Sequence, residues 1–231
     1  MNILAFDTCF GVCSAALGIN LQQSNSSIFS RSEVMNIGHA ERLLPMINEL
    51  LTESHLSVEH IDRIVVTCGP GSFTGVRISI AAARAFQLAR QIPIIPFTSL
   101  EAIALNSEIN EIAMGKDLIV AVDANRGEAY VQIFDGNTKD PLGEPQLLAE
   151  KDFAQLAREQ PVIVVGTAAE KVALSLNTRS KEAQFYNKVL WPGMCETIIK
   201  ALSRPTCESR LEPVYIREPD AKPQDPRGLL A

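Results

Sequence analysis

The stretch from residue 63 to residue 97 constrains the fold more than any other part of the chain. The β-branched run Ile64-Val65-Val66 predicts a buried strand over residues 63–68. A glycine-rich segment at 69–75 follows and opens a helix that extends to about Arg90, and a second strand is expected over 92–97. A strand, a tight turn, a helix and a strand in this order form a βαβ unit, so an α/β fold with parallel strands is predicted.

The segment before this unit is expected to add three strands and one helix. Short apolar runs at 2–6, 13–19 and 27–31 are separated by short connections, which favours antiparallel neighbours in a β-meander. From His39 to Leu51 the apolar residues recur with the period of a helix.

The second half of the chain repeats the alternation of strands and helices, without a sequence repeat. Strands are predicted over 117–122, 129–134 and 161–165, and helices over 151–158, 168–176 and 196–202. We therefore expect two α/β lobes. Residues 1–105 form the first, to which residues 206–231 are a candidate addition, and residues 106–205 form the smaller second.

The charge balance argues against a chain that grips nucleic acid by itself. The sequence has 21 Lys and Arg residues against 27 Asp and Glu residues, which gives a formal net charge of -6. Binding to a phosphate backbone depends on clustered Lys and Arg side chains. A role in a complex whose partner supplies the basic surface stays open.

The cysteines and the apolar runs indicate the compartment. The five cysteines are odd in number and include no C-x-x-C pair, and no signal peptide is recognisable, so reduced thiols and a cytoplasmic protein are expected. No run of about 18 apolar residues occurs, so no membrane span is expected.

The segment 69–75, GPGSFTG, is the sharpest motif, and two interpretations of it stay open. Its turn at the start of a helix either lets the helix pack tightly on the preceding strand or offers free backbone N–H groups to a phosphate. It matches neither a Walker A loop nor G-x-G-x-x-G. A phosphate or nucleotide site of this kind would draw on Asp7, Thr8, Gly69, Gly71, Ser72, Thr74, Gly75 and Gly166.

Other catalytic equipment is sparse in this sequence. Asp123 and Glu128 bracket a charged turn, which is either an acid/base pair or, more simply, a hairpin with a salt-bridged tip. Neither a G-x-S-x-G elbow nor H-E-x-x-H occurs. The histidines His39, His55 and His60 lack metal-binding spacing, so neither catalytic residues nor a metal site is predicted.

Two predicted helices carry more apolar surface than one sheet requires. The helix over 73–90 is rich in alanine, and the helix over 39–51 has a similarly broad apolar face. Either both are fully buried within one subunit, or a second side meets another chain. The residues expected at such an interface are His39, Leu43, Met46, Ile47, Leu50, Val76, Ile78, Ala82, Ala85, Phe86 and Ala89.

The decapeptide GPGSFTGVRI at 69–78 resembles the corresponding block of the TsaB (YeaZ) family. The similarity extends over nearly the whole chain, although the other matching segments are individually weak. They are Ile3-Leu4-Ala5-Phe6-Asp7-Thr8, Cys13-Ser14-Ala15-Ala16-Leu17, residues 39–47, Asp123-Ala124 with Arg126-Gly127-Glu128-Ala129-Tyr130, and Pro213-Val214-Tyr215-Ile216-Arg217.

The resemblance implies an actin-like, ribonuclease-H-like α/β fold, in which each of two lobes has a mixed sheet flanked by helices. It also implies a role in tRNA threonylcarbamoyladenosine modification. A paralogue, TsaD, transfers the threonylcarbamoyl group from threonylcarbamoyl-AMP to adenosine 37. TsaB is the non-catalytic scaffold beside it, and an ATPase, TsaE, joins them.

TsaD-like proteins carry a His-x-x-x-His metal pair at a position where this chain has Ser99 and Ile103. Serine is a poor metal ligand and isoleucine is none, so the comparison implies that the metal site is missing. The resemblance thus implies a TsaD-like and a TsaE-like partner, and no cofactor beyond a vestigial ATP or ADP site is expected. In isolation the apolar surface of the two helices would favour a homodimer, and the acidic charge balance favours contact with tRNA only through the complex. The alternative is a small-molecule kinase or ATPase that uses Asp7, segment 69–75 and Gly166 around ATP.

Overall fold

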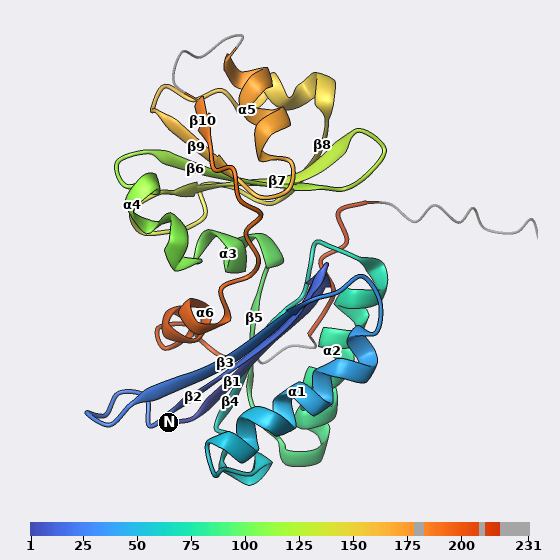
Figure 1. The fold of residues 1–231 in the computed structure, drawn as a ribbon, viewed down its shortest axis with the longest axis vertical. Coiled ribbons are helices and arrows are strands. Elements are labelled where there is room, and N and C mark those ends of the chain that lie inside the picture. The colour runs from blue at the N-terminus through green and yellow to red at the C-terminus, as the bar shows by residue number, and fades with distance from the viewer. Residues whose placement is uncertain (178–182, 208–210, 218–231) are drawn as a thin grey trace, which may run out of the picture.

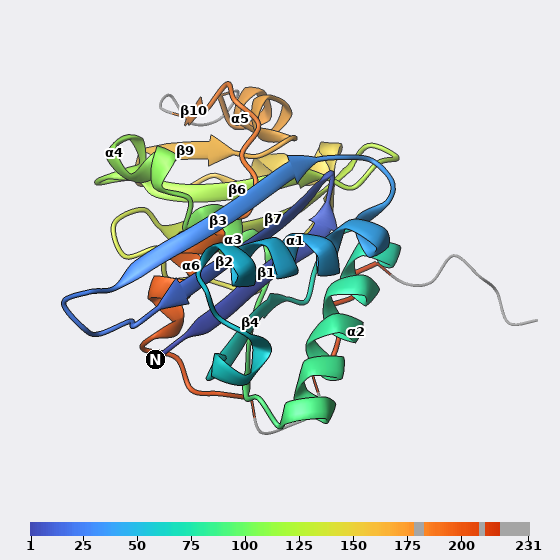
Figure 2. The same ribbon diagram turned by 60° about the horizontal axis from the view of Figure 1, so that its bottom comes forward.

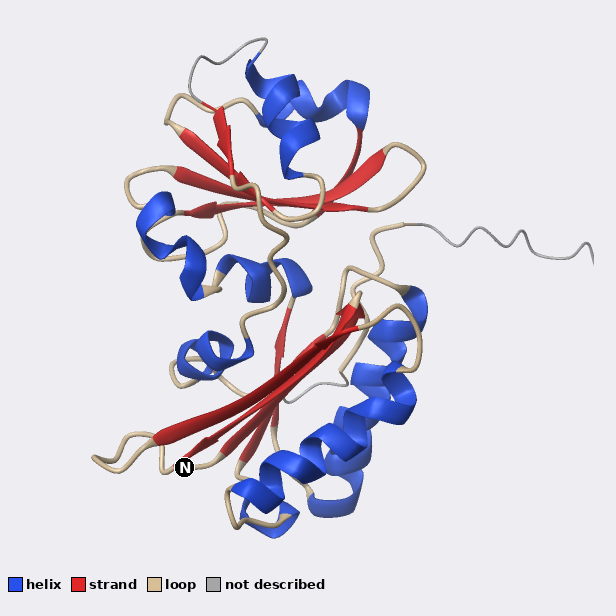
Figure 3. Cartoon of the chain, viewed as in Figure 1, coloured by secondary structure: helices blue, strands red, loops and turns tan. Residues whose placement is uncertain are grey.

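The computed structural model describes residues 1–177, 183–207 and 211–217, and it has two lobes, each built on a five-stranded mixed sheet (Figures 1 and 3). This is the α/β two-lobe architecture predicted from the sequence. The part of the chain described here contains no helix that is both long and apolar enough to cross a bilayer.

The first sheet has the strand order β3-β2-β1-β4-β5. β1 pairs antiparallel with β2, and β2 with β3, which confirms the predicted meander. β1, β4 and β5 run parallel, with α2 between β4 and β5, which confirms the predicted βαβ unit. The strands are β1 (Ile3–Phe10), β2 (Val12–Ile19), β3 (Ser27–Val34), β4 (Arg63–Thr67) and β5 (Ile94–Phe97).

The second sheet repeats this topology strand for strand. Its order is β10-β9-β6-β7-β8, with β6, β7 and β8 antiparallel and β6, β9 and β10 parallel. The short strands β8 and β10 were not predicted from the sequence. The strands are β6 (Asp117–Asp123), β7 (Glu128–Asp135), β8 (Gln146–Ala149), β9 (Val162–Val165) and β10 (Ala183–Phe185).

Helices cover both faces of the first sheet. α1 (His39–Glu53) and α2 (Phe73–Arg90) lie side by side on one face of the sheet (Figure 2) and share an apolar cluster with it. A short 3₁₀ turn, η1 (Val58–His60), precedes β4. α6 (Met194–Ala201) packs on the opposite face, where Ile198 and Ala201 meet Ile3 and Ala5. The first lobe is therefore a three-layer sandwich.

The second sheet is also covered on both faces. α5 (Ala169–Asn177) and the 3₁₀ segment η3 (Glu150–Leu156) share an apolar cluster with one face, so the predicted helix at 151–158 is a 3₁₀ element. On the other face lie α3 (Ser99–Ala104), η2 (Ser107–Ile109) and α4 (Asn110–Ala113). α3 contacts both lobes, because Leu100 and Ile103 belong to the cluster of the second sheet and Ala102 to that of the first.

One expectation about the lobes is corrected by these contacts. α6 lies within residues 106–205, which were expected to form the second lobe, yet its apolar side chains pack on the face of the first sheet. Cys207 and Val214, which follow α6, also lie on the first lobe, since Cys207 pairs with Ile94 of β5 and the amide of Val214 donates to the carbonyl of Cys68 at 2.7 Å. The segment from 206 onward was a candidate addition to the first lobe, but the placement of α6 was not expected, because it depends on which apolar face of the sheets is left uncovered.

Candidate functional site

The 69–75 loop lies directly against the backbone of β1. The amide of Ser72 donates to the carbonyl of Cys9 at 2.7 Å. A Cβ atom at Gly71 would overlap that same carbonyl oxygen, and one at Gly75 would overlap the carbonyl oxygen of Thr8. These glycines therefore allow the loop and the first turn of α2 to touch the strand, which supports the packing interpretation of the motif.

Several polar groups at this helix start are hydrogen-bonded within the protein. The Ser72 hydroxyl caps α2 by accepting from the amide of Gly75 at 3.4 Å. The Thr8 hydroxyl donates to the carbonyl of Gly75 at 2.7 Å and lies 2.7 Å from the hydroxyl of Ser79. Thr8 is fully buried, while Thr74 is exposed on the outer side of the turn.

Two of the residues expected at a phosphate site, Gly69 and Gly166, are glycines with a positive φ. Gly166, with a φ of 102°, lies in the second lobe, where a Cβ atom would overlap the carbonyl oxygen of Ala121. Gly69, with a φ of 99°, packs against the carbonyl of Val214. Both glycines allow close backbone contacts, Gly69 in the first lobe and Gly166 in the second, and the ATP or ADP site stays a prediction.

Asp7 is a buried carboxyl group at the centre of the first lobe. Its exposed fraction is 0%, and its Oδ1 accepts from the Thr67 hydroxyl and from the amide of Cys9 at 3.2 Å. Its Oδ2 is buried without a hydrogen-bond partner. Burial raises the pKa of Asp7, and the Thr67 hydrogen bond and the charge of His39 only partly oppose it.

The α3 positions singled out in the sequence lie in the core. Ser99 and Ile103 are both buried, and α3 is capped by Thr98, whose hydroxyl accepts from the amide of Glu101 at 3.0 Å. Over residues 1–177, 183–207 and 211–217 no group of three or more His, Cys, Asp or Glu side chains is placed to hold a metal ion.

The charged turn at 123–128 is the tip of the β6–β7 hairpin, as predicted. Asp123 lies 3.5 Å from the Lys171 ammonium of α5, and Glu128 forms an ion pair with Arg217. Each carboxylate thus faces a different cation from outside the turn. The salt-bridged interpretation fits this arrangement, whereas the acid/base pair does not.

The expected interface residues divide sharply by exposure. His39, Leu43, Met46, Ile47 and Leu50 of α1, together with Val76 of α2, are buried in the core of the first lobe. The expectation that these six face a partner is wrong, because each has an exposed fraction of 9% or less and so has almost no surface for a partner to cover. His39 is held there by its Nε2, 2.9 Å from the carbonyl of Phe10.

The other expected interface residues lie on α2 and are partly or fully exposed. Ile78, Ala82 and Phe86 are half-buried, and Ala85 and Ala89 are exposed. Ala81 and Leu88 are exposed as well and were missed, although their spacing from Ala85 along a helix puts them on the same side. We call Ala81, Ala85, Leu88 and Ala89 the outer face of α2.

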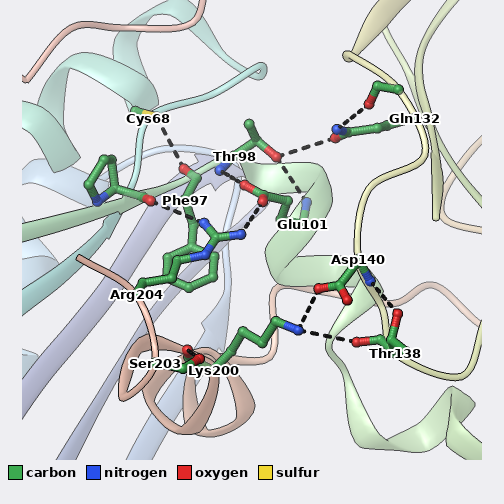
Figure 4. Close-up of polar contacts among 12 residues, drawn as sticks. Cys68, Phe97, Thr98, Glu101, Gln132, Thr138, Asp140, Lys200, Ser203 and Arg204 are labelled. Carbon is green, nitrogen blue, oxygen red and sulfur yellow. Dashed lines mark hydrogen bonds and ion pairs between the residues drawn. The ribbon is translucent and has the colours of Figure 1, made fainter. Parts of the chain in front are cut away.

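Polar contacts connect the two lobes around α3 and α6 (Figure 4). The Lys200 ammonium of α6 donates to the Asp140 carboxylate at 2.7 Å and to the carbonyl of Thr138 at 3.2 Å. The Thr98 hydroxyl lies 3.4 Å from the Gln132 side chain of β7. The guanidinium of Arg204 bonds Glu101 at 2.5 Å and lies 3.9 Å from the centre of the Phe97 ring.

The family model that matches this chain is described as TsaD: tRNA N6-adenosine threonylcarbamoyltransferase, and it covers residues 31–200. A curated relative from Escherichia coli, tRNA threonylcarbamoyladenosine biosynthesis protein TsaB, is 31% identical over 175 residues, which are 72% of this chain and 71% of that protein. The Haemophilus influenzae protein of the same description is 31% identical over 145 residues, which span 62% of this chain and only 58% of that relative.

A solved structure with the same lobes is YeaZ from Pseudomonas aeruginosa. It is 26% identical, superposes with a TM-score of 0.76, and the match covers 93% of this chain and 99% of that one. An uncharacterised protein of Mycobacterium tuberculosis is 30% identical over 227 residues, which are 96% of this chain and 94% of that protein.

Proposed function

The chain belongs to the TsaB family, and from that premise we propose that it takes part in the biosynthesis of tRNA threonylcarbamoyladenosine as a non-catalytic scaffold subunit. In this proposal a TsaD-like paralogue transfers the threonylcarbamoyl group from threonylcarbamoyl-AMP to adenosine 37, and a TsaE-like ATPase joins the complex in the cytoplasm. The relatives described as threonylcarbamoyladenosine biosynthesis proteins support the role in this modification.

The division of labour is supported by the character of this chain. Ser99 and Ile103, which stand where TsaD-like proteins have a histidine pair, are a buried hydroxyl and a buried hydrocarbon. The net charge of -6 favours contact with tRNA through the complex over direct binding. The partner then supplies the reaction centre and the RNA surface, and this chain supplies a docking surface.

The observation that carries the scaffold role is the outer face of α2. Leu88 is 88% exposed, and Ala81, Ala85 and Ala89 line the helix beside it. Small side chains let a second helix approach closely, and an exposed apolar stripe gains free energy when a partner covers it. We therefore place the contact with the TsaD-like paralogue on this face.

A charge introduced at the centre of the outer face of α2 tests the docking surface. Ala85→Glu should leave the fold intact, because the residue is exposed, and should weaken binding to the paralogue by about a hundredfold, since the carboxylate would be buried unpaired. Leu174→Glu on α5 is the matched control, because Leu174 is a 59% exposed apolar helix residue of the second lobe. Calorimetric titration gives both affinities, and circular dichroism verifies folding.

Reconstitution of the modification then tests the function itself. Purified TsaD-like and TsaE-like proteins, threonylcarbamoyl-AMP and tRNA should yield modified adenosine only when this chain is added. The Leu174→Glu chain should support the reaction, and the Ala85→Glu chain should not. Full product without the chain, or equal binding and equal product with both variants, would overturn the proposal.

A further inference from the structure

The segment 211–217, which we call the strap, returns along α2 and forms part of the first lobe. Leu211 is buried in the cluster beneath α2, and its carbonyl accepts from the guanidinium of Arg84. Further along, the amide of Val214 donates to the carbonyl of Cys68 at 2.7 Å. The strap is therefore anchored by backbone hydrogen bonds and by a buried leucine, on the edge where the 69–75 loop begins.

The next strap residue binds the first turn of α2 through its side chain. The ring of Tyr215 stacks on that of Phe73 with a centroid separation of 5.6 Å. The guanidinium of Arg77 lies 3.6 Å from the centre of the Phe73 ring, and its Nε donates to the Tyr215 hydroxyl at 3.1 Å. Tyr215 is thus tied to the same helix whose outer face we propose as the docking surface.

The last described strap residue reaches the other lobe. Arg217 donates to the carbonyl of Ala124 at 2.8 Å and to the carboxylate of Glu128, both at the tip of the β6–β7 hairpin. The side chains of Arg217 and Glu128 are only 24% and 32% exposed, so this ion pair is better shielded from water than an ordinary surface pair. Pro213–Arg217 and the charged turn, two motifs noted separately in the sequence, therefore meet in the fold.

This contact lies apart from the other attachments between the lobes. The chain crosses between the lobes at α3 and again between β10 and α6, and Lys200 of α6 binds Asp140 near these crossings. In Figure 1, α3 and α6 occupy the middle and left of the molecule, and the strap, coloured red, rises on the right beside α2. The covalent connections between the lobes on one side can act as a hinge, and the Arg217–Glu128 ion pair on the other side can act as a latch that holds the lobes together.

We propose that the strap is a latch: Arg217 holds the second lobe in a closed position, and Tyr215 links that closure to α2. The two states are a latched form, with the Arg217–Glu128 pair made, and an unlatched form, in which the lobes rotate about α3. The second part of this inference rests on the proposed function. Binding of the paralogue to α2 and formation of the Arg217–Glu128 pair strengthen each other, because a ligand shifts an equilibrium toward the state it binds better.

The latch is tested first on the isolated chain. Arg217→Glu should increase the hydrogen-exchange rates of the hairpin amides Ala124 and Glu128 about tenfold and enlarge the radius of gyration in X-ray scattering. The double variant Arg217→Glu with Glu128→Arg should restore both. Asp140→Asn, which removes an ion pair on the hinge side, is the control and should leave the hairpin amides unchanged. Unaltered exchange in Arg217→Glu, or no rescue in the double variant, would overturn the latch.

The coupling is tested with the TsaD-like paralogue. Arg217→Glu should lower its affinity about fivefold or more, and the charge-swapped double variant should recover it. Tyr215→Ala should lower the affinity as well but leave the Glu128 amide protected, since Arg217 still holds the hairpin. Binding of wild type and Arg217→Glu with equal affinity would refute the coupling while the scaffold role stands. Failure of the wild type to bind would refute the scaffold role and, with it, the coupling, and the latch measured on the lone chain would stand.

Discussion

Asp7 has an energetic cost in the folded protein that a neutral side chain would avoid. Its Oδ2 has no partner, and burial raises its pKa above the ordinary value of 3.8. The folded state therefore binds a proton at Asp7 more tightly than the unfolded state does. Stability must then fall as pH rises from about 3.8 through the folded pKa, because the carboxylate forms only at the cost of dehydration.

Asp7→Asn should accordingly stabilise the protein at pH 8. The amide oxygen can keep the bonds from Thr67 and Cys9, and the buried charge is gone, so we expect a gain of about 1–3 kcal/mol. The gain should shrink as the pH is lowered toward 4, since the wild-type carboxyl then becomes neutral too. Thermal unfolding of both proteins between pH 4.5 and 8 measures this, and a variant less stable at every pH would show that the carboxylate is favoured by its surroundings.

The cysteine thiols give a second prediction at the scale of single residues. Burial raises the pKa of Cys13 to about 11 and that of Cys68 to about 12, and burial likewise raises that of Cys9. Iodoacetamide at pH 8 should therefore modify the folded chain at the half-buried Cys195 and Cys207, and all five cysteines only after unfolding. Peptide mass spectrometry reads the result, and rapid labelling of Cys13 in folded protein would contradict it.

α2 shows at the scale of an element what a sequence pattern can and cannot reveal. The helix was predicted over 73–90 and is found there. Its alanines, however, cannot be told apart by residue type: Ala83 is buried and Ala85 is exposed, although both lie in the same alanine-rich stretch of the helix. The helical period divides them into faces, but which face meets the sheet depends on how the rest of the lobe packs.

Gly75 yields the prediction that belongs to this helix. In an ordinary helix, glycine to alanine is stabilising by about 1 kcal/mol. At Gly75 the added Cβ would overlap the backbone of β1, so Gly75→Ala should lower the free energy of unfolding by about 1–3 kcal/mol.

The matched control is Gly143→Ala, because nothing lies within 4 Å of a Cβ atom at that glycine. It should be close to neutral. Urea unfolding of both variants supplies the comparison. If the two variants were equally stable, the packing explanation of the 69–75 loop would be wrong.

At the scale of the whole molecule, the two lobes share one strand order that the sequence does not display as a repeat. The long strands of each lobe were predicted, while β8 and β10 were missed. β10 has three residues, too few to establish an alternating pattern, and it is recognisable only by its pairing with β9.

The outer face of α2 also predicts the behaviour of the lone chain. Without a paralogue, a second copy of this chain should cover the outer face of α2, because a self-complementary apolar surface favours a twofold dimer. Sedimentation equilibrium should give twice the 25.2 kDa chain mass, and Ala85→Glu should give one chain mass. A wild-type monomer at high concentration would argue against this use of the face.

The sequence by itself determined the local structure of this protein: the βαβ unit, the glycines of the 69–75 loop, the charged hairpin and the family resemblance. These depend on residues close together in the chain, whose spacing and backbone preferences are legible without a partner. Only the tertiary structure decided that six expected interface residues are core, that α6 covers the first sheet, and that Arg217 meets Glu128 across 89 positions. Burial and long-range pairing arise from which surfaces the folded elements leave for one another, and no local pattern encodes that choice.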